Sequence, residues 1–553
     1  MPAYALALSL AVTAPLLAPG YLLLRDAVST PRSYLTDAAL GLTEAAPRAL
    51  PQDFAVALAS HVVDGGIVVK LLLVCGLWAA ALGAARLADT VIPASGLPGQ
   101  FVAATLAVWN PFVAERLLQG HWSLLLGYGC LPWVAVAVLG LRTQTGRGGW
   151  WPVLFWTALA GLTPTGLMLA AVVALVSCAA PGAGYPRRLC AAASLGAAVL
   201  GALPWLVAPM LAGSLSLTQA AGVPQFAARA EPGLGTLFSL AGLGGIWNGQ
   251  AVPASRTTHF AVVATVVLVG IVAVGLAAAV RLPLARPFLI LSALAVAVPA
   301  LMAVGPGLAT VEAVTRAVPG LGVLRDGQKW VALALPGYAV AGAGVVVTLR
   351  RRVPLIVTAA VCCVALLAVL PDLAWGVGGK VTPVHYPAGW TTAATLIDAD
   401  PRPVAVLPPD SMRHYPWAGA APVLDPLPRW LAADVLTTGD LVISGQTVPG
   451  EGARARVVEH LVRSGAGVDE LSLAGVGWVV AEGKGEPRLA LPVAFADDDL
   501  VVYRVGGDHP AASHRPVMIA AHLVWLGALV AGAVGMIASA IGRRRHPQKR
   551  AVY

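Results

Sequence analysis

An acidic residue stands where the first hydrophobic segment of the chain ends. This segment spans residues 5–24, and Arg25-Asp26 then opens a polar stretch that runs to residue 64. A carboxylate at the end of an apolar helix can reach both a lipid headgroup and a water-soluble molecule, and it can take a proton from a hydroxyl group. Asp26 is therefore a candidate general base. It could instead be an ordinary interfacial residue paired with Arg25.

Three further aspartates share this polar stretch and compete for the same role. They are Asp37, Asp53 and Asp64. Any of them could act as the base or hold a divalent cation such as Mg²⁺ or Mn²⁺, because such ions prefer carboxylate oxygens as ligands. Asp37 thus stays open as a second acidic residue for an acceptor or a metal. No Cys and His cluster with the spacing of a zinc site occurs.

A second polar group lies between two hydrophobic segments, in residues 109–122 (WNPFVAERLLQGHW). Charges at membrane depth are costly when unpaired. Arg116 could bind a lipid phosphate, His121 could polarise a hydroxyl group, and Glu115 could be a second acidic residue. The alternative for Glu115 and Arg116 is an ion pair that holds two helices together. Trp122 could stack on a sugar or anchor the chain at the membrane interface.

A third group precedes the tenth hydrophobic segment. Arg325 and Lys329 are four residues apart, a spacing that places two side chains on one face of a helix. Arg offers a planar fork of donors and Lys a point charge, so the pair could grip a phosphate or diphosphate. Snorkelling toward lipid headgroups is the alternative, and Asp326 could simply neutralise Arg325. In loop 212–258, Trp247 could stack on a sugar.

The elements that must position these residues are mostly hydrophobic. Of the 553 residues, 58% are hydrophobic and 11% are charged, whereas a soluble domain has about 25% charged residues. Since a crossing takes about 20 apolar residues, we expect an α-helical multi-pass membrane protein with about twelve transmembrane helices. Two of the segments are short, and Pro164 between them indicates a tight helical hairpin. The segments are 5–24, 65–86, 98–118, 121–140, 150–162, 164–180, 189–211, 259–280, 286–304, 329–349, 354–375 and 518–541.

Basic residues indicate the topology of the chain rather than a nucleic-acid partner. The net charge is +9, but the cations concentrate in short connections on one side of the predicted membrane, as the positive-inside rule expects. This places both termini in the cytoplasm of a plasma-membrane protein, and loops 25–64, 212–258 and 305–328 outside. The inside residues are Arg86, Arg142, Arg147, Arg187, Arg188, Arg281, Arg286, Arg350, Arg351, Arg352 and the five cations of the tail 543–550.

The chain divides into three parts. Residues 1–376 form the predicted membrane domain, 377–515 are rich in charge, proline and turn residues, and 516–553 hold the last hydrophobic helix and a basic tail. We expect a small extracytoplasmic α/β domain in the middle part. None of the six cysteines lies in it, so no disulfide framework supports it. Three apolar runs typical of strands and one segment with helical spacing are found there: 403–407, 475–480, 500–505 and 454–464.

This plan resembles the type C glycosyltransferase superfamily, and in particular its actinobacterial branch of arabinofuranosyl- and mannosyltransferases. The resemblance rests on the acidic residue after the first segment, the long first outside loop, the number of spans, the C-terminal outer domain and the motifs in 109–133 and 325–329. It implies a GT-C-like fold and transfer of arabinofuranose or mannose from a polyprenyl-phosphate donor to a cell-envelope glycan or glycolipid. Asp26 matches the catalytic acidic position of the family. The donor phosphate would be held by Arg325, Lys329, Arg116 and His121.

The chain departs from the family pattern at the position of Asp26. Many members carry two neighbouring acidic residues there, whereas Asp26 lies between Arg25 and Ala27.

The expected partners are the lipid-linked donor, the acceptor and membrane lipids, without nucleic acid, and dependence on Mg²⁺ or Mn²⁺ stays open. Two other classes of function also remain: a lipid or glycolipid transporter that escorts a headgroup with the same cations, and a non-catalytic scaffold for envelope assembly.

Overall fold

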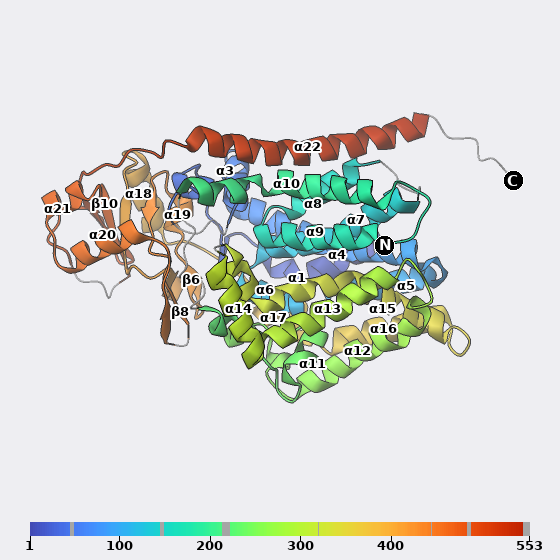
Figure 1. Ribbon diagram of the computed structural model, residues 1–553. Coiled ribbons are helices and arrows are strands. Elements are labelled where there is room, and N and C mark those ends of the chain that lie inside the picture. The colour runs from blue at the N-terminus through green and yellow to red at the C-terminus, as the bar shows by residue number, and fades with distance from the viewer. Residues whose placement is uncertain are drawn as a thin grey trace.

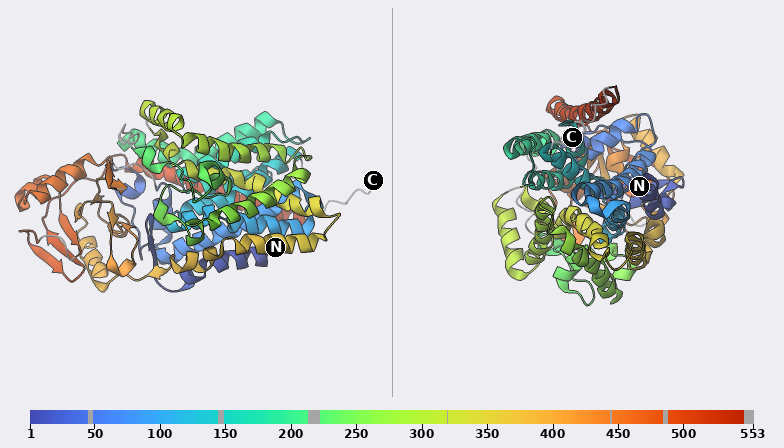
Figure 2. Two further views of the ribbon diagram at one scale, coloured as in Figure 1. Left: turned by 90° about the horizontal axis from the view of Figure 1, so that it is seen from below. Right: turned by 90° about the vertical axis from the view of Figure 1, so that its right-hand side faces the viewer.

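The protein consists of a body of long helices with a sheet region at one end (Figure 1). It is 65% helical, and the further views show the sheet region projecting from the end of the helical body (Figure 2). Arg147, the tail beyond Arg545 and part of loop 212–258 lie outside the described residues. The computed structural model describes residues 1–44, 49–143, 149–212, 222–318, 320–443, 445–483 and 488–545.

Among these residues, seven helices are long and apolar enough to cross a membrane, or up to nine if two bent helix pairs each count as one span. The structure thus has the helical content and the apolar helices of a multi-pass membrane protein, whereas twelve crossings are not confirmed. The seven are α4 (Gly65–Val91), α5 with α6 (Pro93–Gln119), α7 (Trp122–Thr143), α10 (Arg187–Ala212), α12 (Phe260–Ala279), η8 with α15 (Gly327–Leu349) and the part Arg515–Gly542 of α22 (Arg515–Arg545).

Two predicted segments form helices that are too short for a full crossing. α8 (Trp151–Ala160) has 10 residues and α9 (Pro164–Cys178) has 15, against the about 20 that a bilayer core requires. Pro164 occupies the first turn of α9, where a missing backbone N–H costs nothing. The Thr163 side chain caps the same helix by accepting a hydrogen bond from the Gly166 amide at 3.0 Å. The short hairpin expected from Pro164 is therefore present.

The two bent pairs turn sharply at glycine and proline residues. α13 (Arg286–Met302) and α14 (Gly305–Ala317) meet at 91°, so α14 runs across the bundle axis rather than along it. Residues 305–328 are predicted as a loop, and α14 corrects this, because Pro306 in its first turn favours a helix start. The second pair consists of α16 (Leu355–Ala368) and the segment Pro371–Gly379, bent by 72°, which contains η9 (Pro371–Leu373) and α17 (Ala374–Gly379).

The sequence predicts that the first hydrophobic segment is one helix, but the structure divides this segment into a helix, a 3₁₀ turn and a strand. α1 (Pro2–Thr13) passes into the 3₁₀ turn η1 (Ala14–Leu17), because Pro15 and Pro19 cannot donate the backbone hydrogen bonds that a longer helix needs. The chain then forms strand β1 (Tyr21–Leu24), which pairs with β2 (Ala27–Val28) and with β3 (Pro383–Val384). Asp26 therefore lies in the turn of a β-hairpin and not at the end of a helix.

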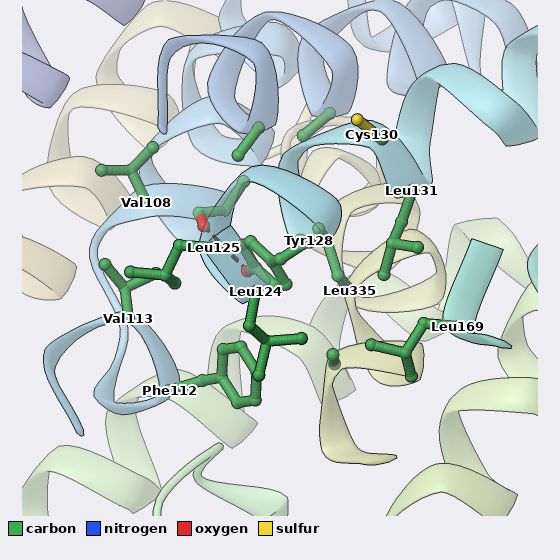
Figure 3. Close-up of a cluster of buried hydrophobic side chains, with 14 of the residues drawn as sticks. Val108, Phe112, Val113, Leu124, Leu125, Tyr128, Cys130, Leu131, Leu169 and Leu335 are labelled. Atoms are coloured by element: carbon green, nitrogen blue, oxygen red, sulfur yellow. Dashed lines mark hydrogen bonds between the residues drawn. The ribbon is translucent and has the colours of Figure 1, made fainter. Parts of the chain in front are cut away.

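The core of the helical body is packed closely enough to hold its helix ends in fixed positions. Glycines allow α4 and α7 to touch, because a Cβ on Gly129 would lie 2.1 Å from the carbonyl oxygen of Gly76. Phe112 of α6 stacks on Tyr128 of α7 with ring centroids 5.1 Å apart (Figure 3). The Tyr128 hydroxyl donates to the Ala107 carbonyl at 2.8 Å. This packing fixes α6 against α7 and so holds the C-terminal end of α6, with its polar residues, in place.

The C-terminal sheet region that the sequence predicts is present. Its largest sheet has five strands in the order β11–β12–β10–β4–β7, with β10 parallel to β4 and antiparallel to β12. Helix α20 (Ala453–Arg463) agrees with the predicted helical spacing. Other helices of the region are α18 (Ala388–Asp398), α19 (Leu427–Trp430) and α21 (Val468–Leu473). The strands of the five-stranded sheet are β4 (Val404–Leu407), β7 (Val435–Leu436), β10 (Trp478–Glu482), β11 (Val493–Ala496) and β12 (Leu500–Arg504).

Candidate functional site

The hairpin that carries Asp26 rests on the C-terminal end of α6 (Pro111–Gln119). Leu24 pairs with Ala27, so Arg25 and Asp26 are the two residues of the turn. The Asp26 amide donates to the Gln119 carbonyl at 3.1 Å. Gly120 ends α6 with φ 85°, and a Cβ there would lie 2.2 Å from the Ala27 nitrogen. Glycine is thus required both for the left-handed turn and for the contact with the hairpin.

The Asp26 carboxylate is oriented through one of its two oxygens. Oδ2 accepts hydrogen bonds from Gln119 Nε2 and from His121 Nε2, each at 2.9 Å. Asn248 Nδ2 donates to Gln119 Oε1 at 2.7 Å and so fixes which end of that amide faces Asp26. The Asp26 side chain is 40% exposed, and its Oδ1 accepts no hydrogen bond from the described part of the chain. A second molecule can therefore reach this oxygen.

The protonation states of Asp26 and His121 follow from their neighbours. Burial raises the pKa of Asp26, but the hydrogen bonds from His121 and Gln119 outweigh this effect, so the net pKa is below its ordinary value. Burial lowers the pKa of His121; Asp26 opposes this, and Arg116 adds to it. At neutral pH Asp26 is a carboxylate and His121 is uncharged.

The tautomer of His121 is set by Arg116. His121 Nδ1 lies 3.1 Å from Arg116 Nη1. A guanidinium group only donates, so Nδ1 must be the acceptor and the ring proton sits on Nε2. His121 therefore donates that proton to Asp26, an assignment that rests on the hydrogen-bond network.

Behind His121 lies a buried ion pair between helices. Arg116 is fully buried, and its Nη1 and Nη2 donate to the two oxygens of Asp326 at 2.9 and 3.1 Å. Burial raises the pKa of Asp326, but Arg116 and Lys329 together hold it well below its ordinary range. Lys329 Nζ is 3.7 Å from Asp326 Oδ2, and its side chain is 23% exposed. The alternative of a helix-pairing arginine is thus realised, with Asp326 and not Glu115 as the partner of Arg116.

Glu115 is placed as a structural residue. Its carboxylate is buried and accepts from the backbone amides of Gly245 and Ile246, each at 3.1 Å, and from Gln328 Nε2 at 3.0 Å. Gln328 Oε1 in turn accepts a hydrogen bond from Arg116. With both oxygens engaged inside the protein, Glu115 ties α6 to two other segments and is not directed at an acceptor or a metal.

Arg325 and Lys329 do not share a helical face as their spacing predicts. The chain forms two 3₁₀ helices, η7 (Leu321–Arg325) and η8 (Gly327–Ala334), separated at Asp326, whose ψ of 86° is not helical. The Arg325 guanidinium lies over the ring of Phe226 at 4.1 Å, while Lys329 faces Asp326. The two cations thus face different neighbours.

The aromatic candidates differ from each other. Trp247 is half-buried and packs against Phe226 with centroids 4.6 Å apart and a T-shaped geometry. Trp122 is 3% exposed within the hydrophobic core, so it is not open to a sugar.

Asp37 is also engaged elsewhere, since it pairs with Arg515 at 2.5 Å and accepts from the Ala512 amide at 2.8 Å. It anchors the start of α22.

The residues do not fit a divalent cation. Within the described ranges no three His, Cys, Asp or Glu side chains are grouped so that they could hold a metal ion. Asp26 and His121 supply two ligands at most, and the carboxylate of Asp326 is used by Arg116. Two cations, Arg116 and Lys329, already neutralise that part of the site. The chemistry is therefore derived without Mg²⁺ or Mn²⁺.

Sequence reasoning brings together the right segments and misses several members. Asp26, Arg116, His121 and Lys329 do belong to one network, whereas the roles of Gln119 and Asp326 are not foreseen. A polar residue directly before the glycine that ends a helix was the available signal for Gln119. The residues whose contacts at the site sequence reasoning does not foresee are Gln119, Asn248, Asp326 as the partner of Arg116, Gln328 and Phe226.

A second buried charged cluster lies in the sheet region. Arg413 Nε donates to Glu482 Oε2 at 2.9 Å, and its Nη2 lies 3.5 Å from Asp425 Oδ2. The Tyr415 hydroxyl also donates to Glu482 Oε2 at 2.8 Å. Burial and the charge of Asp425 raise the pKa of Glu482 to about 8 despite Arg413. This cluster is closed to solvent, since Arg413, Asp425 and Glu482 are each 4% exposed.

The arrangement as a whole is a half-exposed carboxylate, oriented by a neutral histidine and flanked by a partly exposed lysine. Comparisons with protein families, with characterised proteins and with solved structures find no match to this chain. The chemistry of the site is consequently the basis on which a function can be proposed.

Proposed function

We propose that the protein is a membrane glycosyltransferase that moves arabinofuranose or mannose from a polyprenyl-phosphate donor to a cell-envelope glycan or glycolipid. The reaction takes place at the outer face of the plasma membrane, with both chain termini in the cytoplasm. The observation that carries the proposal is the Asp26 carboxylate, because it presents one oxygen within range of the charge of Lys329, in the turn that pairs with Val423 of the sheet region.

In this mechanism Asp26 Oδ1 takes the proton of the acceptor hydroxyl. The acceptor oxygen then forms a bond to the anomeric carbon of the donor sugar. The bond from that carbon to the phosphate oxygen breaks, and its electron pair leaves with the polyprenyl phosphate. The charge that develops on the phosphate is met by Lys329, which acts as a preorganised cation. A single displacement of this kind inverts the anomeric configuration.

The remaining polar residues support the base and the cations rather than the substrate. His121 donates to Asp26 and keeps the second oxygen of the carboxylate directed outward. Arg116 is buried and paired with Asp326, so we assign it a supporting role and leave phosphate binding to Lys329, since the Arg325 guanidinium lies over Phe226. The exposed 23% of the Lys329 side chain is the part that a phosphate can approach.

The test is transfer by the purified protein from a panel of polyprenyl-phosphate sugars, arabinofuranose and mannose included, to acceptor oligosaccharides. Products are identified by mass spectrometry. We expect wild type to add one sugar and Asp26→Asn to add none above background. Asp53→Asn is the matched control, because Asp53 lies in the same outer stretch but pairs with Arg429. Full activity of Asp26→Asn would exclude Asp26 as the base.

The same preparation separates the two other classes of function. A transporter would move the lipid-linked sugar across vesicles, and Asp26→Asn would leave that movement intact while Lys329→Met would impair it. A scaffold would give neither product nor movement with any donor. Either result would replace the enzyme proposal.

A further inference from the structure

Arg25, the residue before Asp26, has an unusual backbone conformation. Its φ is 50°, in the left-handed region that residues other than glycine rarely adopt. Such a conformation persists when its surroundings fix it, and it is a reason to ask what the residue does. At Arg25 the surroundings contact both the backbone and the side chain.

The backbone of Arg25 is held by the sheet region. Its amide donates to the Pro422 carbonyl at 2.9 Å, and its carbonyl accepts from the Leu424 amide at 2.8 Å. Arg25 thereby forms a parallel bridge with Val423, a residue of strand β6 (Val423–Leu424). The turn that presents Asp26 is thus clamped by a segment almost 400 residues later in the chain.

The side chain of Arg25 is held by the helical body. The guanidinium is buried, with the whole residue 6% exposed. Nη1 donates to the Leu118 carbonyl at 2.5 Å and Nη2 donates to the Gln250 carbonyl at 2.9 Å. Leu118 is in the last turn of α6, where carbonyl groups lack helical partners and a cation is favoured. The adjacent Asp26 amide satisfies the next carbonyl, that of Gln119.

Arg25 therefore joins three separate parts of the protein at one turn: α6, the segment around Gln250, and β6. The Asp26 carboxylate depends on the same α6 end, since its partners Gln119 and His121 are the next residues along. A shift of the turn relative to α6 would break both hydrogen bonds to Asp26 Oδ2.

We infer that Arg25 is the positioning residue of Asp26, and that docking of β6 onto the turn is required to hold the carboxylate in place. The inference deepens the proposed function, on which the catalytic use of Asp26 rests. The geometric part, the fixing of the turn, is independent of what reaction takes place.

Three variants test the inference in the full-length protein. Arg25→Gly places at this position a residue that tolerates the positive φ, and it removes the guanidinium contacts. Leu424→Pro removes the amide that donates to the Arg25 carbonyl. Arg32→Ala is the control, because Arg32 also donates to a backbone carbonyl, that of Ser60, but touches neither α6 nor β6. Each variant is measured by amide hydrogen exchange of peptides covering 21–28 and 117–122, and by steady-state transfer.

For Arg25→Gly we expect exchange in both peptides to rise about tenfold or more, because the hydrogen bonds that protect them open locally. The kcat should fall about 100-fold with KM within about threefold, as misplacement of a catalytic group predicts, and added ethylguanidinium should restore part of it. Leu424→Pro should change the same two peptides in the same direction. If Leu424→Pro does not fold, its amide hydrogen exchange will rise throughout the helical body. In that case the result for Arg25→Gly, with and without ethylguanidinium, decides whether the inference holds.

The two possible failures can be told apart. If exchange of the two peptides in Arg25→Gly matches that in Arg32→Ala, the positioning role is wrong, whatever the activity. If exchange rises but wild type transfers no sugar, the proposed function is wrong and the role of Arg25 in fixing the turn stands. A loss of kcat without any change in exchange would make Arg25 a chemical participant, and this would also overturn the inference.

Discussion

The network that begins at Asp26 and the cluster around Arg413 in the sheet region both pair a buried arginine with carboxylates. They differ in charge balance and in access. In the first, two carboxylates are balanced by Arg116 and Lys329, and one of the carboxylates reaches solvent. In the second, two carboxylates share one arginine and all three residues are closed off.

The pKa values follow from this difference. Despite burial, hydrogen bonds from His121 and Gln119 hold the pKa of Asp26 below its ordinary value, and Arg116 and Lys329 do the same for Asp326. Burial and the negative charge of Asp425 raise the pKa of Glu482 to about 8, and burial raises the pKa of Asp425. The same residue types thus make a carboxylate that stays charged and available in one place, and one that favours the protonated form in the other. Access and charge count separate a candidate reactive group from a structural one.

The largest effect should come from removing the accessible carboxylate. Asp26→Asn is expected to lower the rate of sugar transfer by about 10²–10⁴-fold, the usual contribution of a general base. Its thermal unfolding should stay close to that of wild type, because the amide can keep an acceptor oxygen toward His121 and Gln119. Initial rates and a melting curve on the same preparation measure both. A rate within about threefold of wild type would remove the distinction between the two clusters.

Breaking the closed cluster should damage stability instead of chemistry. Arg413→Met leaves Glu482 and Asp425 buried without their cation, and such losses cost about 3–5 kcal/mol. We expect faster hydrogen exchange in β4 and β10, and a lower melting temperature of the sheet region. The control is Arg463→Met, which removes a largely exposed cation paired within α20. Equal effects of the two substitutions would contradict the buried ion pair.

Lys329→Met sharpens the comparison from the side of the cations. Loss of the lysine removes a positive charge from the leaving phosphate, and one such electrostatic contact is worth about 10²-fold in kcat. The charge of Lys329 also lowers the pKa of Asp26, so the acid limb of the kcat/KM profile should move to higher pH. Unchanged kcat would mean that Lys329 neutralises Asp326 and does nothing else.

The stability of the sheet region should depend on pH through Glu482. Because its folded pKa is raised, the folded state retains a proton that the unfolded state loses between its ordinary value of 4.5 and about 8. The stability that this group contributes is therefore present at low pH and is lost as pH rises through that window. Melting temperatures at pH 5.5 and 8.5 measure the difference. Glu482→Gln should flatten it, whereas the exposed Glu470→Gln should leave it unchanged.

The smallest effect should come from His121→Phe, which keeps a ring and removes both nitrogens. Loss of the hydrogen bond to Oδ2 raises the pKa of Asp26, and the acid limb of kcat/KM should shift upward by about one pH unit. The exposed His61→Phe is the control. An acid limb that stays in place would show that Gln119 suffices to hold the carboxylate.

How much of this could be predicted from the sequence depends on the distance between partners. Apolar runs predict most helices because each run is local, and the short hairpin at Pro164 is predicted for the same reason. The end of the first segment is not predicted correctly, since β1 pairs with β3 at 383–384, far along the chain. The strands β4, β10 and β12 are recognisable from short runs of apolar residues.

The candidate site follows the same rule. The Asp26–His121 contact joins residues 95 positions apart, and the Arg116–Asp326 pair joins residues 210 apart. A single sequence does not indicate which distant residues form a pair. Arg116 is therefore predicted to bind a phosphate, whereas in the structure its guanidinium donates to Asp326. The residue types are nevertheless informative, because a charged residue at membrane depth requires a partner, and the partners do gather at one end of the helical body.

The parallel bridge between Arg25 and Val423 also has a meaning in time. The ribosome completes the turn at Asp26 long before it reaches Leu424, and at about 5–20 residues per second the interval is about 20–80 s. During that interval the nascent chain carries the carboxylate without the strand that clamps its turn. Synthesis of the sheet region is thus the step that finishes the site, and a chain that stops before residue 422 ends without it.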